Sequence, residues 1–302
     1  YLSEALHWTF PTLVLSAGGL LVLLPVGYVL TFGKFGLPEM GAGGLGVASA
    51  IMLWMQAIGF AVVLWRSKRF ADLKLFERFD LPEWSIIRGL LATGLPIGVT
   101  VLMEGGLFIA TALLMGRLGE VPAAAHQIAI NLASLCFMVP MGLAEATTVR
   151  VGHALGRGDF AGVRRAAYAG YTIVIGTQLF SGLVLLTGND LLVSFYTGDA
   201  AVATLAASLL LYAAAFQFPD GVQVLSAGAL RGLKDTRVPM LLAAMAYWGI
   251  GMPLGAGLGL GLGWGPKGMW IGLIAGLTVA ALVLCTRFLR SSQPDRLVMR
   301  GP

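Results

Sequence analysis

Charged side chains are scarce in this sequence. Only 12% of its 302 residues are Asp, Glu, Lys or Arg, whereas a soluble domain carries about 25%. This scarcity excludes a soluble globular enzyme, a disordered protein and a nucleic-acid-binding protein of the basic-patch kind, so we expect no nucleic acid partner. Apolar residues make up 57% of the chain, and the mean hydropathy is +0.83. The composition therefore predicts an integral membrane protein.

Cysteine and histidine are also rare. Cys136 and Cys285 lie singly inside apolar runs without CxxC spacing, and His7, His126 and His153 are scattered along the chain. This distribution excludes both a disulfide framework and a zinc site. We expect no resident cofactor, and no metal ion other than a transported Na⁺.

The apolar residues are gathered into long runs. A helix needs about 20 apolar residues to cross the hydrocarbon core of a membrane. Eight runs meet this requirement, at roughly residues 11–32, 43–65, 89–116, 121–149, 165–187, 202–230, 238–262 and 267–288. We predict an all-α integral membrane protein with about eight transmembrane helices. Because the sequence begins at Tyr1 and not at Met, we also expect its natural start to lie upstream.

The basic residues are distributed unevenly between the two sides of these predicted spans. All but three of the 20 Lys and Arg residues lie in alternate loops on one side or in the tail, the exceptions being Lys34, Arg117 and Lys267. Basic residues gather in cytoplasmic loops. The pattern therefore predicts a multi-pass protein of the cytoplasmic (inner) membrane with both ends of this chain in the cytoplasm, and every Lys and Arg outside the hydrophobic spans.

Two connections between spans resemble each other. Residues 33–41 contain a Gly-rich exit, Pro38 and Gly41, and residues 261–268 repeat this order with Pro266 and Gly268. Transporters are often built from two repeats, so spans three to eight are predicted to form one complete unit. We place the last two helices of an N-terminal lobe at 1–66, a cytoplasmic linker at 67–88, a six-helix C-terminal lobe at 89–290 and a cytoplasmic tail at 291–302. Alternatively, the likeness reflects only two joins between Gly-rich helices.

Three acids lie within the predicted spans: Glu104, Glu145 and Asp220. An ionisable group at membrane depth costs about 2.5–3.5 kcal/mol on insertion scales and usually marks an ion or substrate path. Glu145 is less informative, because it lies about one turn from Arg150 at a span end, where an ion pair or a snorkelling side chain explains it. His126 is also interpreted as structural, as a packed polar group at the start of a helix.

Glu104 and Asp220 each accompany a helix-disrupting proline. Pro96 precedes Glu104 by two turns, and Pro219 directly precedes Asp220. Because proline removes a backbone donor, we expect bends that free carbonyl oxygens near the acids. Two acids in two such helices predict a shared cation site between spans three and six; the alternative is that each forms only a structural hydrogen bond. The candidates for polar cavity residues are Gln127, Asn131, Gln217 and Gln223.

Several stretches resemble the multidrug and toxic compound extrusion (MATE) family, in its NorM-type branch. The resemblance covers nearly the whole chain and rests on Gly-Leu-Pro96 with Glu104, Ala-Ala-His126-Gln127, Met138-Val-Pro140, Thr148-Val-Arg150-Val-Gly152 and Asp220-Gly-Val-Gln223 running into Gly228-Ala-Leu-Arg231-Gly-Leu-Lys234-Asp235-Thr. Such proteins have twelve helices in two lobes, and the resemblance implies that this chain supplies helices five to twelve. The family's cation site maps onto Glu104 and Asp220. A tyrosine of that site, one turn before the Asp, is Phe216 here.

The resemblance implies a secondary active antiporter. It would export cationic or amphipathic drugs and toxic compounds in exchange for Na⁺ or H⁺, by alternating access and without covalent chemistry. Its partners would be the small-molecule substrate and the lipid bilayer, and we expect a monomer. One alternative is a lipid-linked oligosaccharide flippase of a related two-lobe fold, whose cavity would need cationic residues for pyrophosphate. Another is an integral-membrane enzyme, which would need a catalytic cluster that the sequence does not show.

Overall fold

The computed structural model of this chain describes residues 8–36, 38–67 and 83–293, and within these ranges it contains helices and no strands. Eight of the described helical segments are long and apolar enough to cross a membrane. The predicted all-α membrane fold is therefore confirmed. The eight segments are α2 (Phe10–Phe32), α3 (Ala42–Arg66), α5 (Trp84–Leu118), α6 (Glu120–Gly156), α7 (Phe160–Thr187), α9 (Ala200–Gly232), a seventh span at Arg237–Gly261, and α12 (Gly265–Ser291).

The chain divides into two compact units, the first ending at Glu83 and the second beginning at Trp84. In the first unit α2 and α3 form an antiparallel hairpin, and α2 ends at Gly33, whose left-handed backbone (φ 62°) favours glycine. The second unit holds α5 to α12. Most of the predicted linker (67–88) and tail (291–302) falls at residues 68–82 and 294–302, outside the described residues, so the domain boundaries stay a prediction.

Several helices extend beyond their apolar runs at one end of the second unit. α5 begins at Trp84 and not at residue 89, α6 ends at Gly156 and not at 149, and α7 begins at Phe160 and not at 165. The expectation that every Lys and Arg lies outside the spans is therefore wrong at these ends. Hydropathy marks only the lipid-embedded part of a helix, whereas backbone hydrogen bonding continues into the polar region. The basic residues that now lie within helices include Arg88, Arg150, Arg164, Arg165 and Arg231.

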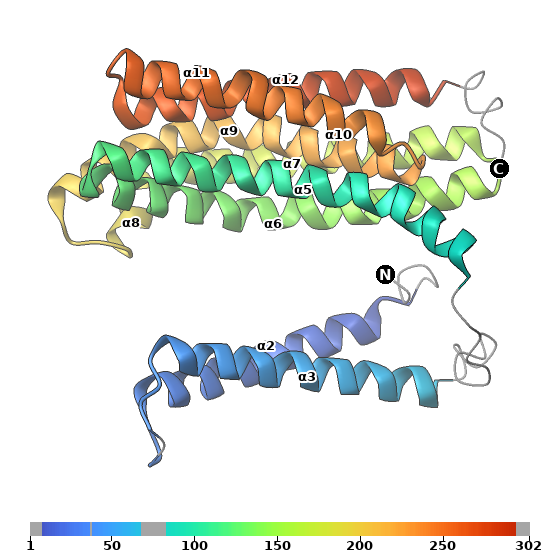
Figure 1. The fold of residues 1–302 in the computed structure, drawn as a ribbon, viewed down its shortest axis with the longest axis horizontal. Helices are drawn as coiled ribbons and strands as arrows, with labels where there is room; N and C mark the ends of the chain where they lie inside the picture. Colours follow the sequence, from blue (N-terminus) through green and yellow to red (C-terminus); the bar gives the residue numbers. More distant parts are fainter. Residues whose placement is uncertain (1–7, 37, 68–82, 294–302) are drawn as a thin grey trace. The chain divides into compact units, whose positions relative to one another are not determined.

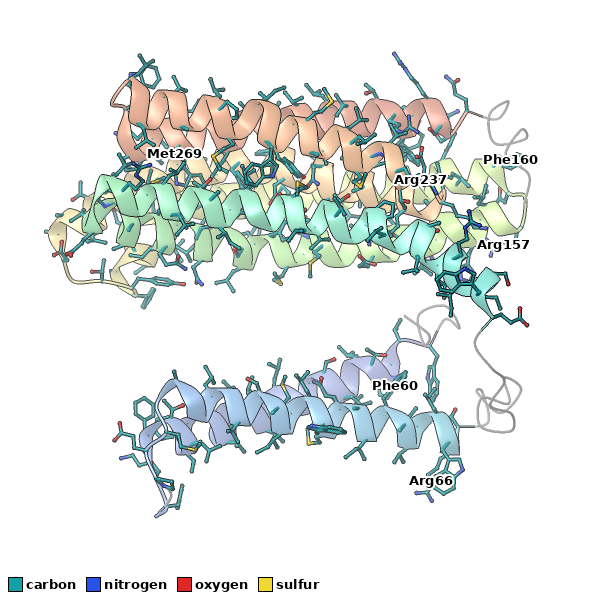
Figure 2. All side chains as sticks on the ribbon, viewed as in Figure 1. Phe60, Arg66, Arg157, Phe160, Arg237 and Met269 are labelled. Carbon is teal, nitrogen blue, oxygen red and sulfur yellow. The ribbon has the colours of Figure 1, made fainter. Side chains whose placement is uncertain are left out.

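Figure 2 shows where the labelled residues lie in the second unit. Arg157, Phe160 and Arg237 lie near one end of its helices, and Met269 lies toward the other end. Large apolar side chains cover the outward faces of the described helices, among them Leu102, Ile109 and Leu113 of α5. A helix with apolar side chains outside can lie in hydrocarbon, because its backbone polar groups are hydrogen-bonded within the helix.

Helix α9 lies inside the second unit, between α6 and α12 (Figure 1). Small residues allow the close approach of α6: a Cβ at Gly228 would lie 2.6 Å from the carbonyl oxygen of Ala144, and the Thr148 hydroxyl donates a 2.8 Å hydrogen bond to the Gly228 carbonyl. Small residues and interhelical hydrogen bonds are the usual means by which membrane helices associate. The central position of α9 explains why polar residues on it are buried.

The seventh span is not a uniform α-helix. It is built from α10 (Arg237–Ala244), the π-helical segment η1 (Met245–Gly251), α11 (Met252–Ala256) and a second π-helical segment, η2 (Gly257–Gly261). Pro253 removes one backbone donor within this span. Glycines 251, 255 and 259 face glycines 268, 272 and 276 of α12 in backbone contact. π-Helical turns occur frequently at functional sites.

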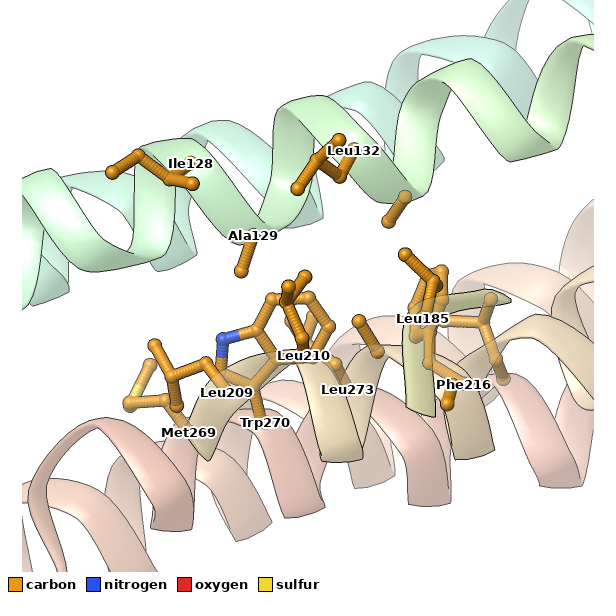
Figure 3. Packing of buried hydrophobic residues seen from close by; sticks show 14 of the residues in the cluster. Ile128, Ala129, Leu132, Leu185, Leu209, Leu210, Phe216, Met269, Trp270 and Leu273 are labelled. Atoms are coloured by element: carbon orange, nitrogen blue, oxygen red, sulfur yellow. The ribbon is translucent and has the colours of Figure 1, made fainter. Parts of the chain in front are cut away.

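The core of the second unit is aromatic and aliphatic. Figure 3 shows Ile128, Ala129 and Leu132 of α6 facing a layer that includes Phe216 and Trp270. Trp270, Tyr247, Phe216 and Phe288 are the largest fully buried side chains among the described residues. This layer is the rigid wall against which the acids of α5 and α9 are placed.

Candidate functional site

Glu104 of α5 and Asp220 of α9 line one cavity inside the second unit. Its volume is about 140 Å³, and α6 supplies its remaining wall through Ile130, Ala133, Ser134 and Phe137. Asp220 is only 2% exposed, and its Oδ1 makes no hydrogen bond within the described part of the chain. The structure thus brings the two predicted acids to a common space.

Phenyl rings form the apolar part of this cavity. Phe108, Phe137 and Phe216 line it together with the acids. Phe108 and Phe216 meet edge to face with centroids 6.0 Å apart, and Phe216 meets Trp270 in the same way at 5.8 Å. Ring faces attract cations by about 0.5–2 kcal/mol when the contact is desolvated. The cavity therefore combines negative charge with surfaces that suit an organic or inorganic cation.

A third oxygen-bearing side chain approaches the acids from the seventh span. Tyr247 lies on η1 and is fully buried, and its neighbour Trp248 hydrogen-bonds the carbonyl oxygen of Met103, the residue before Glu104. Its hydroxyl forms no hydrogen bond within the described residues. Buried hydroxyls are normally partnered, so this one is available to a bound ion or water.

The turn of α5 that carries Glu104 is attached to the seventh span. Trp248 Nε1 donates a 3.1 Å hydrogen bond to the carbonyl oxygen of Met103. Gly106 leaves room for this indole, because a Cβ there would lie 3.2 Å from Trp248 Cζ2. The Glu-Gly-Gly sequence after Met103 therefore lets Trp248 hold the Glu104 turn against the π-helical segment that presents Tyr247.

A second, smaller cavity of about 50 Å³ adjoins Glu104. Thr100 and Glu104 line it from α5, and Gln223 and Arg231 line it from α9. Gln223 is 1% exposed, and its Oε1 makes no hydrogen bond within the described part of the chain. Glu104 is the one residue that lines both this cavity and the larger one.

The two prolines lie inside uninterrupted helices. α5 is continuous through Pro96, and α9 is continuous through Pro219. Each proline still removes the amide that a carbonyl one turn earlier would accept from, which for Pro219 is the carbonyl of Ala215. The helices are therefore not broken beside the acids, and the bends expected there stay a prediction.

The other predicted polar residues do not line these two cavities. Gln127 and Asn131 are exposed, and Asn131 Oδ1 accepts a 2.7 Å hydrogen bond from the Tyr196 hydroxyl. Gln217 is buried, but its Oε1 and its backbone carbonyl accept from Gln178 Nε2 of α7 at 3.1 and 2.7 Å. It joins two helices instead of facing the cavity. Of the four predicted amides, the structure brings only Gln223 to Glu104.

The structure also locates Glu145 and His126, which are interpreted from the sequence as structural residues. Glu145 forms its ion pair with Arg231 of α9, and not with Arg150 of its own helix as expected. The reason is that α6 and α9 pack closely at this level, which the sequence does not show. His126 is buried with its ring edge-to-face on Trp270 at 5.8 Å, and neither ring nitrogen makes a hydrogen bond among the described residues.

The chemistry of the site is electrostatic. Among the described residues there is no group of three or more His, Cys, Asp or Glu side chains that would hold a metal tightly. Two carboxylates, a tyrosine hydroxyl and phenyl faces are instead suited to an exchangeable cation. An uncompensated carboxylate in apolar surroundings is costly, so the arrangement can attract a positively charged group.

Comparison with known proteins identifies the family. A family model described as MatE matches residues 96–256, which include both acids, the three phenylalanines of the larger cavity and Tyr247. This chain belongs to the MatE family. The NorM-type MATE resemblance is therefore confirmed, and the chain belongs to a family of multi-pass membrane transporters, not of enzymes.

Its curated relatives are bacterial multidrug resistance proteins. A probable multidrug resistance protein NorM of Xanthomonas campestris is 70% identical over 293 residues, which cover 97% of this chain and 64% of the relative. A NorM of Xylella fastidiosa is 62% identical, with 95% and 61% covered. The multidrug resistance protein PmpM of Pseudomonas aeruginosa is 43% identical, with 96% and 62% covered. The chain thus spans somewhat less than two thirds of these relatives, whose bacterial NorM type indicates the inner membrane.

Solved MATE transporters share its fold. The MATE transporter NorM-NG, solved in a complex that includes a monobody, is 33% identical with a TM-score of 0.77, over 95% of this chain and 62% of that chain. The eukaryotic MATE transporter AtDTX14 is 20% identical with a TM-score of 0.82, over 95% and 65%. The second likeness concerns the fold alone.

Proposed function

We propose that the protein is a secondary active antiporter that exports cationic or amphipathic compounds in exchange for Na⁺ or H⁺. The observation that carries this proposal is the cavity shared by Glu104 and Asp220, which lie on two candidate membrane spans. The family and the multidrug resistance names of its relatives support the substrate class. The basic ends of its helices support an orientation with both ends of this chain in the cytoplasm.

Coupling follows from the electrostatics of the cavity. Two carboxylates in an apolar surrounding strongly favour a bound positive charge. A coupling ion supplies that charge in one state, with the carboxylates of Glu104 and Asp220 as oxygen donors. Loss of the ion changes which conformation the lobes favour, because a ligand shifts a conformational equilibrium by its difference in affinity for the two states. Inward flow of the ion then drives outward movement of the substrate.

The flippase alternative receives no support from the cavity. A lipid-linked pyrophosphate would need several cationic groups around it, whereas the charged residues that line the larger cavity are both acids. Arg231 lines only the smaller cavity, where it is paired with Glu145. The lining chemistry thus favours a cation over an anion.

The test uses a full-length version in which this chain is joined to the segment of the 70%-identical Xanthomonas relative that it does not span. Glu104→Gln and Asp220→Asn keep the shape of the side chains and remove the charge. In proteoliposomes under an imposed Na⁺ or pH gradient, each variant should lose gradient-driven efflux of a fluorescent organic cation. Asp190→Asn is the matched control, because it makes the same chemical change at an exposed acid. Gradient-driven efflux by both neutralised variants with unchanged ion dependence would falsify the proposal.

A further inference from the structure

The smaller cavity extends from Glu104 toward the end of the unit at which α9 terminates. Its volume of about 50 Å³ exceeds the roughly 15 Å³ that one water molecule requires. Its lining begins at Glu104 and Gln223 and continues to Arg231, Asp235 and Thr236, which lie at and just beyond the end of α9. The cavity is therefore a polar-ended space between a partly buried acid and the end of the bundle.

Glu104 connects this space to the larger cavity. It lines both, whereas Asp220 lines only the larger one and Arg231 only the smaller one. A cation held at Glu104 is thus adjacent to two separate spaces. Arrival through one space and departure through the other requires no rearrangement of the acid itself.

The wall contributed by α9 has a regular spacing. Gln223, Ala227 and Arg231 recur every four residues and so lie on one face of the helix. At a rise of 1.5 Å per residue, they span about 12 Å along the helix axis. Gln223 Oε1 lacks a hydrogen-bond partner within the described residues, and Thr100 supplies a hydroxyl from α5. Both features suit a passage that holds water or an ion in transit.

Charged residues close the far end of this passage. Arg231 pairs with Glu145 of α6. Arg287 of α12 donates two hydrogen bonds to the Asp235 carboxylate, at 3.0 and 3.1 Å. The side chain of Arg231 is 25% exposed, so its charge is only partly screened by solvent. It is the cationic side chain that lines the passage, and Glu104 is the acid at the inner end.

From this geometry we propose that the α5–α9 cavity is the route by which the coupling cation leaves Glu104, and that Arg231 is the residue that promotes its release. The inference rests on the proposed antiport function, which it deepens by assigning the release path. The positive charge of Arg231 lowers cation occupancy at Glu104 from this side. Glu145 holds the guanidinium at the end of the passage, so that the charge acts from a fixed position and does not fill the space. The end of α9 lies on the side where most of the basic residues gather, and this charge pattern assigns that side to the cytoplasm.

The route is tested without any transport measurement. In the full-length version, with Cys136 and Cys285 replaced by alanine, Thr100→Cys places a thiol in the cavity wall. Ag⁺, a small thiol-reactive cation, is applied from the side at which α9 ends, and the free thiols that remain are titrated after unfolding. Leu102→Cys is the matched control, because Leu102 lies two residues away and faces outward with 66% exposure.

We expect Ag⁺ to consume the Thr100→Cys thiol at least tenfold faster than the Leu102→Cys thiol. Equal rates for the two thiols would overturn the route. This outcome is separate from the fate of the proposed function, because labelling does not depend on efflux. If Glu104→Gln loses coupling but the two thiols are labelled at equal rates, the antiport function is supported and the proposed release path is refuted.

The role of Arg231 is tested by charge removal and charge restoration. Arg231→Gln should lower the half-saturating concentration of the driving ion, with Na⁺ titrated at fixed pH and pH titrated at fixed Na⁺, and should slow turnover because release is impeded. We expect a shift of roughly fivefold. A unit charge acting across the roughly 12 Å length of the passage, at an effective dielectric constant of about 20, would give about tenfold, and the paired Glu145 carboxylate offsets part of this effect.

Arg231→Lys should restore the original half-saturating concentration, since it keeps the charge. Arg165→Gln is the control for a generic loss of an arginine, because Arg165 is 77% exposed and only 3.6 Å from Asp159 in a solvent-facing pair. If Arg231→Gln folds and leaves the half-saturating concentration unchanged, or if the lysine variant behaves like the glutamine variant, the assignment is wrong.

Discussion

The contact between the seventh span and α12 can be perturbed by a single methyl group. A Cβ added at Gly272 would lie 2.7 Å from the carbonyl oxygen of Gly251 and would overlap the backbone of Gly255. Carbon contacts are optimal at about 3.5–4.0 Å. Since the obstructing atoms are backbone, Gly272→Ala must displace the seventh span by about 1 Å. That span carries Tyr247 and Trp248, so the displacement reaches the acid site.

The size of the effect follows from two opposing terms. Overpacking of a close contact costs about 1–3 kcal/mol, and replacing glycine by alanine in a helix recovers about 1 kcal/mol. Gly257→Ala is the matched control, because it lies in the same pair of segments and its added Cβ would meet nothing within 4 Å. The two variants should therefore differ by about 2 kcal/mol in the free energy of unfolding.

The measurement is thermal unfolding of the full-length version in detergent, followed by efflux in proteoliposomes. A difference of about 2 kcal/mol corresponds to a difference in midpoint of about 4–8 °C for a domain of this size. Gly272→Ala should also lower ion-coupled efflux, while Gly257→Ala should not. Equal midpoints and equal efflux for the two variants would show that the glycine contact does not position the seventh span.

Three other changes address the residues around the site. Trp248→Phe removes the hydrogen bond to the Met103 carbonyl, so it should cost about 1 kcal/mol of stability and weaken coupled efflux; unchanged ion dependence would contradict its positioning role. Phe216→Tyr restores an oxygen beside the larger cavity, so transport should persist with stronger Na⁺ dependence, measured as efflux against Na⁺ concentration. Gln178→Leu leaves the buried amide of Gln217 without its partner, so thermal unfolding should show a loss of about 1–3 kcal/mol while the ion dependence of efflux stays the same.

The spans and the acids were predictable because their signals are local. Each span is a continuous apolar run, and hydropathy alone places it to within a few residues at its lipid-embedded part. Glu104 and Asp220 stand out because a charge inside such a run needs a reason. The misplaced boundaries lie where helices continue past the apolar run, since backbone hydrogen bonding does not depend on side-chain polarity.

The residues that were missed depend on contacts between distant segments. A tyrosine within a span carries no signal of its own, and Tyr247 lies buried on the π-helical segment η1, which the sequence does not reveal. Arg231 directly follows an apolar run and so reads as a loop residue, yet α9 continues through it and directs it into a cavity. Its partner Glu145 lies 86 residues earlier in the chain. Asn131 was predicted to line the cavity because it is a polar residue within a span. The structure places it instead on the exposed face of α6, where its side chain accepts a hydrogen bond from the Tyr196 hydroxyl.

The two carboxylates of the site are chemically alike but not equivalent in position. Asp220 is 2% exposed on the central helix and lines only the larger cavity, whereas Glu104 lies where the two cavities meet. In the proposed antiporter, a cation shared by both acids is held tightly, and one held by Glu104 alone is adjacent to the passage toward Arg231. Transfer from the shared position to Glu104 therefore weakens binding before release, because half of the negative charge is left behind. Under this proposal, the unequal placement of the two acids gives ion movement a direction within a single bundle, before any motion of one lobe against the other.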